Sequence, residues 1–260
     1  MPPVANAPER RTSAPTRRHY SRSPVLEAVI EIRVELPDDV REETLRAARA
    51  GDEARYPDVV PVMQGAVNIN LDATGSTPPT TSATAQRAGY LFRGPAELFQ
   101  ATRDGFSYHK LAPYSEWESC RDEARRLWAK YRHVARPRRL TRLGLRYVNR
   151  LDLPTPAELK DYLLTFPEIA PGPPQFLSGY MMQLSIPQPD LPGAVLVMRQ
   201  GLVGAPAPGV ASLLLDIDLA YVLNLSGDSD EFWHVFEELH NRQIATFESC
   251  ITDKTRELIS

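Results

Sequence analysis

Two segments far apart in the chain share one alternating pattern of apolar and charged residues. In residues 25–36 and 139–153 nearly every second residue is apolar, and most of the residues between them are charged. A period of two places apolar side chains on one face of a β-strand and charged side chains on the other. The charges are opposite in sign: Glu27, Glu31 and Glu35 in the first segment, and Arg142, Arg146 and Arg150 in the second. We therefore predict two neighbouring strands, each with one face in the core.

Matching these charges gives a register for the two strands. The antiparallel pairs are then Glu27–Arg150, Glu31–Arg146 and Glu35–Arg142. The same register sets Gly144 opposite Arg33, which leaves room for the arginine side chain. Cross-strand pairs of opposite charge contribute roughly 0.2–1 kcal/mol each, and a slip by one residue would turn charge toward the core. The charge pattern therefore predicts that these strands form a central pair.

The same order of elements is predicted after each of the two strands. The first is followed by a short helix that ends near residue 50, strands near 59–71, 89–93, 97–103 and 106–111, and a long helix. The second is followed by a short helix, strands near 177–186, 194–203 and 211–219, and a long terminal helix. Three tetrapeptides have the capping-box pattern of a helix start: Ser115–Glu118, Thr155–Glu158 and Asp228–Glu231.

This order predicts an α+β fold in which two strand–helix–strands–helix halves form one curved antiparallel sheet with long helices on one face. The arrangement resembles that of the TATA-binding protein, a likeness of fold that implies no function. The predicted parts are a disordered basic tail at residues 1–23, an N-terminal half at 24–136 and a C-terminal half at 137–260 of one pseudo-duplicated domain. Residues 74–85, rich in Thr, Ser, Pro and Gly, are predicted to form a mobile loop.

Composition limits the class of protein. The chain has 260 residues, of which 42% are hydrophobic and 24% charged, as is ordinary for a globular protein. It has no apolar run of the roughly 18 residues that a transmembrane helix needs, and its N-terminus lacks the apolar segment of a secretory signal, so we expect no membrane partner. Cys120 and Cys250 are too few for a disulfide framework. They indicate a reducing compartment, the cytoplasm.

The polar face of the predicted sheet is the first candidate site. Besides the charged residues of the central strands, the alternation places on it Gln183, Ser185, Arg199, Asp216 and Asp218. One interpretation is a solvated face whose ion pairs fix the register of the strands. The other is a concave surface that binds a charged ligand, a peptide or nucleic acid. Interspersed carboxylates are unusual on a surface that binds phosphate, which requires positive potential.

The sequence shows no set of residues typical of catalysis or metal binding. Glu27 and Glu31 would lie roughly 13 Å apart at about 3.3 Å per residue, which is too far for the paired carboxylates of a glycosidase. His234 and His240 are six residues apart, whereas helical metal ligands need a spacing of three or four. We therefore predict no catalytic residue, no metal site and no cofactor.

Three segments resemble motifs of an uncharacterised, sporadically distributed bacterial family whose members have about the length of this chain. These are a PxxEAxxEIR motif at Pro24–Arg33, an LRYxNR motif within Leu143–Arg150, and an LHxxxxxxF motif at Leu239–Phe247, followed by Ile251-Thr-Asp253. The resemblance implies no established activity. The patchy distribution of the family implies mobile gene neighbourhoods, where accessory proteins of defence or toxin systems are common.

These observations predict a non-enzymatic binding or assembly module, an accessory subunit of a bacterial defence-type system whose partner is another protein. One alternative is a nucleic-acid-binding protein that uses the arginine-bearing sheet face. A second is a small-ligand-binding protein with a pocket between the sheet and a long helix, beneath Trp128 or Phe236. The predicted binding residues are Glu27, Glu31, Arg33, Arg142, Arg146, Asn149 and Arg150.

Overall fold

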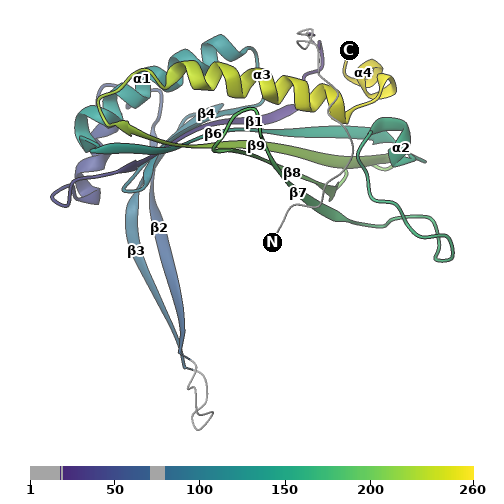
Figure 1. Cartoon of the computed structure of the whole chain (residues 1–260), viewed down its shortest axis with the longest axis horizontal. Coiled ribbons are helices and arrows are strands. Elements are labelled where there is room, and N and C mark those ends of the chain that lie inside the picture. Colours follow the sequence, from purple (N-terminus) through teal and green to yellow (C-terminus); the bar gives the residue numbers. More distant parts are fainter. Residues whose placement is uncertain (1–17, 19, 71–79) are drawn as a thin grey trace.

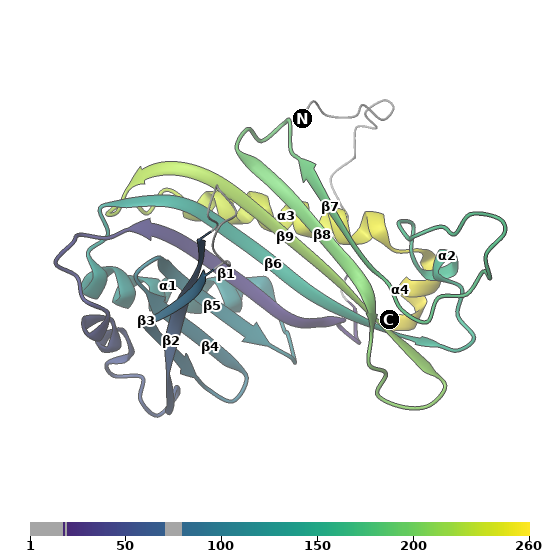
Figure 2. The same ribbon diagram turned by 90° about the horizontal axis from the view of Figure 1, so that it is seen from below.

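The alternating segments form strands, and all strands of the described residues belong to one antiparallel sheet of nine (Figures 1 and 2). The computed structural model describes residue 18 and residues 20–70 and 80–260, without the side chains of residues 66–70 and 80–85. The order across the sheet is β2-β3-β4-β5-β1-β6-β9-β8-β7. The strands are β1 (Val25–Glu35), β2 (Asp58–Asn70), β3 (Thr80–Arg93), β4 (Glu97–Thr102), β5 (Gly105–Leu111), β6 (Arg139–Pro154), β7 (Met181–Pro187), β8 (Ala194–Val203) and β9 (Val210–Ser226).

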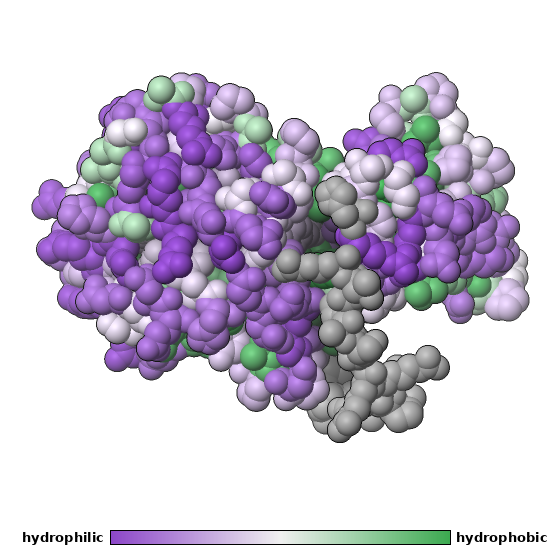
Figure 3. Space-filling model, turned by 90° about the horizontal axis from the view of Figure 1, so that it is seen from above, coloured by the Kyte–Doolittle hydropathy of each residue, from purple (hydrophilic) through white to green (hydrophobic). Residues whose placement is uncertain are grey.

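Helices pack against the apolar side of the sheet. The helices are η1 (Glu42–Arg49, a 3-10 helix), α1 (Trp117–Ala135), α2 (Leu159–Tyr162), α3 (Trp233–Cys250) and α4 (Asp253–Ile259). Residues at a spacing of three and four on α1 are buried, and the rings of Trp128 and Phe106 lie 6.0 Å apart between α1 and β5. Most residues on the outer, helix-bearing surface are hydrophilic (Figure 3). The core is therefore the layer between α1, α3 and the sheet.

The predicted fold class is wrong. We expected two like strand–helix–strands–helix halves with long helices, but one nine-stranded sheet dominates the structure, and strand residues exceed helical residues. The helices α2 and α4 have only 4 and 7 residues. Meanwhile β6 and β9 extend over 16 and 17 residues, and β3 begins at Thr80, inside the predicted loop. Threonine is β-branched and favours strands, so a segment taken as a loop lengthens the sheet instead.

None of the three predicted capping boxes forms. Helices α1, α2 and α3 begin at Trp117, Leu159 and Trp233, and no side chain caps any of them. Before α3, the Ser229 hydroxyl accepts a hydrogen bond from the Glu231 amide in a local turn, because a short polar side chain competes equally well for turn amides. The long terminal helix predicted after Asp228 is also interrupted, and α4 begins anew beyond Ile251.

Strands β1 and β6 are antiparallel neighbours, as predicted, but the predicted register is wrong by two residues. Glu31 lies opposite Gly144 rather than Arg146. A side chain in place of Gly144 would have its Cβ 3.3 Å from Glu31, so the glycine makes room for the glutamate and not for Arg33. A shift of two residues leaves every side chain on its own face. The buried residues of both strands are therefore still Ile30, Ile32, Leu143 and Leu145 among others.

Two predicted flexible segments fall partly outside the described residues. Residues 1–17 and 19 of the predicted basic tail, and residues 74–79 of the predicted loop, lie outside them. The rest of the tail contacts the C-terminal helices: the Arg22 amide donates to the Ile259 carbonyl at 3.0 Å, and the ring of Tyr20 lies 6.4 Å from that of Phe247. Residues 80–85 belong to β3.

Candidate functional site

The polar face of the sheet is the side away from the helices (Figure 2). It carries all but one of the predicted site residues. On this face lie Glu27, Glu31, Arg33, Arg142, Arg146 and Arg150. The predicted partners are wrong, because the register differs. Arg142 and Arg33 contact Glu31, Arg146 donates to Asp216 at 2.7 and 2.8 Å, and Arg150 donates to Asp152 at 2.8 Å. Each of these arginines has a carboxylate partner on the face itself.

Asn149, the remaining predicted residue, lies on the opposite, helix-bearing face. It is 3% exposed, and its amide donates to the Leu215 carbonyl at 3.1 Å. There it lines a hollow of about 670 Å³ between α3, the sheet and the N-terminal segment that begins at Arg18. We call this hollow the α3 pocket. The structure therefore separates Asn149 from the charged residues with which it was grouped.

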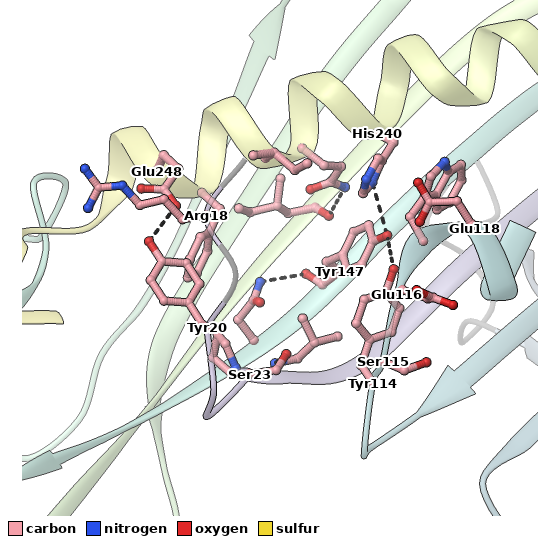
Figure 4. Close-up of a pocket in the computed structure, with 18 of the residues that line it drawn as sticks. Arg18, Tyr20, Ser23, Tyr114, Ser115, Glu116, Glu118, Tyr147, His240 and Glu248 are labelled. Carbon is pink, nitrogen blue, oxygen red and sulfur yellow. Dashed lines mark hydrogen bonds between the residues drawn. The ribbon is translucent and has the colours of Figure 1, made fainter. Parts of the chain in front are cut away.

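A hydrogen-bonded row of aromatic side chains forms one end of the α3 pocket (Figure 4). The Tyr114 and Tyr147 hydroxyls are 2.8 Å apart, and the Tyr147 hydroxyl lies 3.3 Å from Nδ1 of His240. The His240 ring stacks on Trp117, with ring centroids 4.4 Å apart and planes 11° apart. The indole nitrogen of Trp117 in turn donates to Glu237 at 3.0 Å. These contacts hold three elements, the start of α1, β6 and α3, in one fixed arrangement.

Gln243 fixes α3 onto the middle of the sheet. Its Nε2 donates to the carbonyls of Leu145 and Ile217, both at 2.7 Å. Two carbonyl acceptors determine the orientation of the amide, because a flipped amide would place its oxygen against them. Oε1 of Gln243 is buried and has no hydrogen-bond partner among the described residues. A buried acceptor without a partner costs about 1–3 kcal/mol, so the wall of the α3 pocket holds an unsatisfied polar group.

The N-terminal segment forms the other end of the α3 pocket. Figure 4 shows Tyr20 beside Glu248 of α3, with Arg18 and Ser23 nearby. The Tyr20 hydroxyl donates to Glu248 at 2.6 Å, and Glu248 also accepts from Arg256 of α4 at 2.9 Å. Residues distant in sequence therefore close the pocket through hydrogen bonds to the C-terminal helices.

Two pocket tyrosines are held in the protonated form. Burial, and then the neighbouring Tyr114, hold the pKa of Tyr147 well above its usual value of 10.0. Burial, and then the hydrogen bond to Glu248, raise the pKa of Tyr20 to about 12. Both phenols are therefore neutral near pH 7 and serve as hydrogen-bonding groups, not as bases.

The sequence pointed to a pocket of this kind, but not to its place or its residues. The predicted location of the pocket, beneath Trp128 or Phe236, is wrong. Both side chains are fully buried, and neither lines the α3 pocket. Tyr147, His240 and Phe247 are specified residues of the motifs, whereas Gln243 stands at an unspecified position of the third motif and Tyr114 lies outside all three. In space, residues from all three motif segments line the pocket, namely Pro24, Val25, Tyr147, Asn149, His240 and Phe247.

The described residues provide neither a cluster of metal ligands nor an exposed thiol. No group of three or more His, Cys, Asp or Glu among the described residues could hold a metal ion. The thiols of Cys120 and Cys250 are free and buried, and burial raises their pKa values to about 12 and about 11. Both thiols therefore stay protonated and weakly nucleophilic near pH 7.

The chain matches no protein-family model and no curated protein. Among the described residues, no helix has the length and apolar character required to cross a membrane.

Proposed function

We propose that the protein binds a small, largely apolar molecule in the α3 pocket. The observation that carries this proposal is the row of hydrogen-bonded Tyr114, Tyr147 and His240 at the wall of a hollow of about 670 Å³. Small-molecule sites of about 300–1,000 Å³ typically combine apolar walls with a few fixed polar groups. Phe247, Ile244 and the stacked Trp117–His240 pair supply the apolar and aromatic surface here.

The polar groups suggest the chemistry of the ligand. Tyr147 is neutral, and the buried amide of Asn149 lies beside it on β6. Neutral hydroxyl and amide groups recognise ligands through hydrogen bonds and give little selectivity for charge. We therefore propose an uncharged or weakly charged aromatic molecule, with a hydrogen-bonding group directed at the tyrosine row. The convergence of all three motif segments on this pocket supports placing the site here.

Filling the α3 pocket tests the proposal. Ile244→Trp places a larger side chain in the lining, and the matched control Asn241→Trp places the same side chain on an exposed position of α3. Mass spectrometry under native conditions, followed by organic extraction, should find a small molecule with the purified wild-type chain and with Asn241→Trp. The Ile244→Trp variant should carry less than a tenth as much. Equal amounts in all three proteins, or no molecule and no thermal stabilisation by a panel of aromatic compounds, would contradict the proposal.

A second candidate is assembly with another protein, as expected from the sequence. It is favoured by β7, an edge strand that carries no charge and whose one proline, Pro187, stands at its end, because edge strands of soluble proteins usually carry charge or proline against unwanted pairing. Met181 on β7 is 89% exposed and Phe176 just before it is 78% exposed. The family resemblance supports an accessory role in a bacterial system, and the two free cysteines support the cytoplasm.

Co-expression with the products of neighbouring genes tests the assembly role. A stable complex should form with the wild-type chain and be lost in Met181→Lys, while Asn241→Lys, an equal change at an exposed site on α3, should retain it. Recovery of an uncomplexed chain in each co-expression would speak against assembly. We do not extend the proposal to nucleic acid, because Arg142, Arg146 and Arg150 each contact a carboxylate, which lowers the positive potential that phosphate requires.

A further inference from the structure

Three side chains on the polar sheet face, the side opposite the α3 pocket, form a continuous hydrogen-bonded row. Nε2 of His109 lies 2.9 Å from the hydroxyl of Ser107, and Nδ1 lies 2.7 Å from a carboxylate oxygen of Glu27. Ser107 and His109 are two residues apart on β5, so both point to the same face. Glu27 is on the neighbouring strand β1. This row supplies a hydroxyl, an imidazole and a carboxylate in the order that activated nucleophiles require.

The carboxylate determines which nitrogen of His109 carries the proton. The pKa of Glu27 is lowered, first by the hydrogen bond from His109, so the carboxylate is ionised near pH 7 and can only accept. Nδ1 therefore donates to Glu27, which leaves the lone pair of Nε2 directed at the Ser107 hydroxyl. In this tautomer His109 is placed to take the proton of Ser107.

The surroundings of Ser107 offer space for a substrate and a donor for an oxyanion. Ser107 and Gln100 line a hollow of about 210 Å³ on the polar face, and Gln100 is the direct cross-strand neighbour of Ser107 on β4. Such neighbours have Cβ atoms about 4.5–5.5 Å apart. The other neighbour, Glu31, is neutralised by Arg33 and Arg142. The Gln100 amide donates no hydrogen bond within the described residues, so it is available to a ligand.

We propose that Ser107, His109 and Glu27 form a catalytic set that hydrolyses esters of short carboxylic acids, with Gln100 as the oxyanion donor. The Ser107 oxygen forms a bond to the ester carbonyl carbon while its proton passes to Nε2 of His109. The bond from that carbon to the alcohol oxygen then breaks, and His109 gives the proton to the leaving alcohol. Water, deprotonated by His109, attacks the acyl-serine; the serine oxygen leaves and regains its proton, so that ester and water become acid and alcohol.

The size of the hollow sets the substrate class. About 210 Å³ is below the roughly 300–1,000 Å³ of sites for larger ligands, so the acyl group is short, such as acetyl. The polar face is open to solvent at this point: side chains of His109 and Glu27 are 16% and 30% exposed. The alcohol portion of the ester can therefore extend into solvent and need not fit a pocket.

Two measurements on the full chain test this activity. The first is turnover of p-nitrophenyl acetate by wild type, Ser107→Ala, Glu27→Gln and Gln100→Ala, with Ser185→Ala as the matched control, because Ser185 is an exposed serine on the same face in β7. Each site variant should lose at least ten-fold in kcat/KM while its thermal unfolding matches that of the control, which should keep full activity. The second is labelling with a fluorophosphonate probe and peptide mapping, which should place the label on Ser107.

Results of either measurement can overturn the proposed activity of Ser107. Turnover that persists in Ser107→Ala would mean that His109 or another group acts alone, and it would overturn the proposal. A fluorophosphonate label on any other residue, or none on the folded wild-type chain, would overturn it as well. Asn241→Trp, at an exposed position of α3 that lines neither hollow, should leave this turnover unchanged.

Discussion

The observed register predicts that Arg146 stabilises the sheet through Asp216 and not through Glu31. Arg146 donates two hydrogen bonds to the buried carboxylate of Asp216, at 2.7 and 2.8 Å. Hydrogen bonds to charged groups contribute about 1.5–3 kcal/mol each, so the pair contributes at most about 3–6 kcal/mol. Arg146 is 43% exposed, and Arg199 also lies 3.3 Å from Asp216. Solvent screening and this second partner reduce the expected loss for Arg146→Met to about 2 kcal/mol.

A pair of double-mutant cycles, followed by urea denaturation, measures this coupling directly. The cycle of Arg146→Met with Asp216→Asn should give a coupling free energy of about 2 kcal/mol. The cycle of Arg146→Met with Glu31→Gln should give less than about 0.5 kcal/mol, because Glu31 contacts Arg33 and Arg142 instead. A larger coupling for Glu31 than for Asp216 would refute the register and the reasoning built on it.

Two further predictions concern the turn after β4 and the N-terminal segment. Gly105→Ala should lower the free energy of unfolding by about 1–3 kcal/mol, because its Cβ would lie 2.2 Å from the Ile32 carbonyl oxygen. The control Gly179→Ala, whose Cβ would have no atom within 4 Å, should be nearly neutral. Equal losses in the two variants would contradict this packing. Tyr20→Phe should destabilise the fold at pH 8, and its deficit should shrink as pH rises from about 10 toward about 12. The folded state keeps the Tyr20 proton to higher pH than the unfolded state does, so this contribution is complete below the unfolded pKa and is lost above it. A deficit that is constant in denaturation curves from pH 8 to 11 would count against the contact with Glu248.

Alternation predicted which residues of the central strands are buried, but it could not choose among registers. Ile32 and Leu143 reach the core in any register displaced by an even number of residues, since a slip of two keeps each side chain on its face. More than one of these registers places glutamates of β1 beside arginines of β6. Arg146 has its partner, Asp216, on β9, 70 residues away, and the charge pattern of β1 and β6 alone contains no information about that strand.

The sites were harder to foresee than the buried faces, because each is assembled from several elements. Ser107 and His109 share a face by spacing alone, yet only the pairing of β1 with β5 identifies Glu27 as the carboxylate beside them. The α3 pocket depends on Tyr114, in the segment before α1, and on Gln243, in the middle of a helix. Neither residue belongs to a pattern whose period or spacing indicates a pocket. Their role follows from tertiary packing, which the sequence does not display.

The strands β2 and β3 leave the sheet together as a two-stranded arm (Figure 1). Only Gly89–Arg93 of β3 pairs with β4, whereas β3 pairs with β2 from Thr80 onward. From Thr80 to Ala88, β3 pairs only with β2, so each strand of the arm has a single neighbour there. A lone pair of strands is marginally stable in water. The amide protons of the arm should therefore exchange with solvent through local opening, long before those of β1 and β6, whose exchange requires the sheet to unfold. Met63, Gln64 and Ala88 at the base of the arm line the hollow beside Ser107. Beyond this base, the arm can change in length or sequence between related chains without altering the cooperative unit that contains both sites.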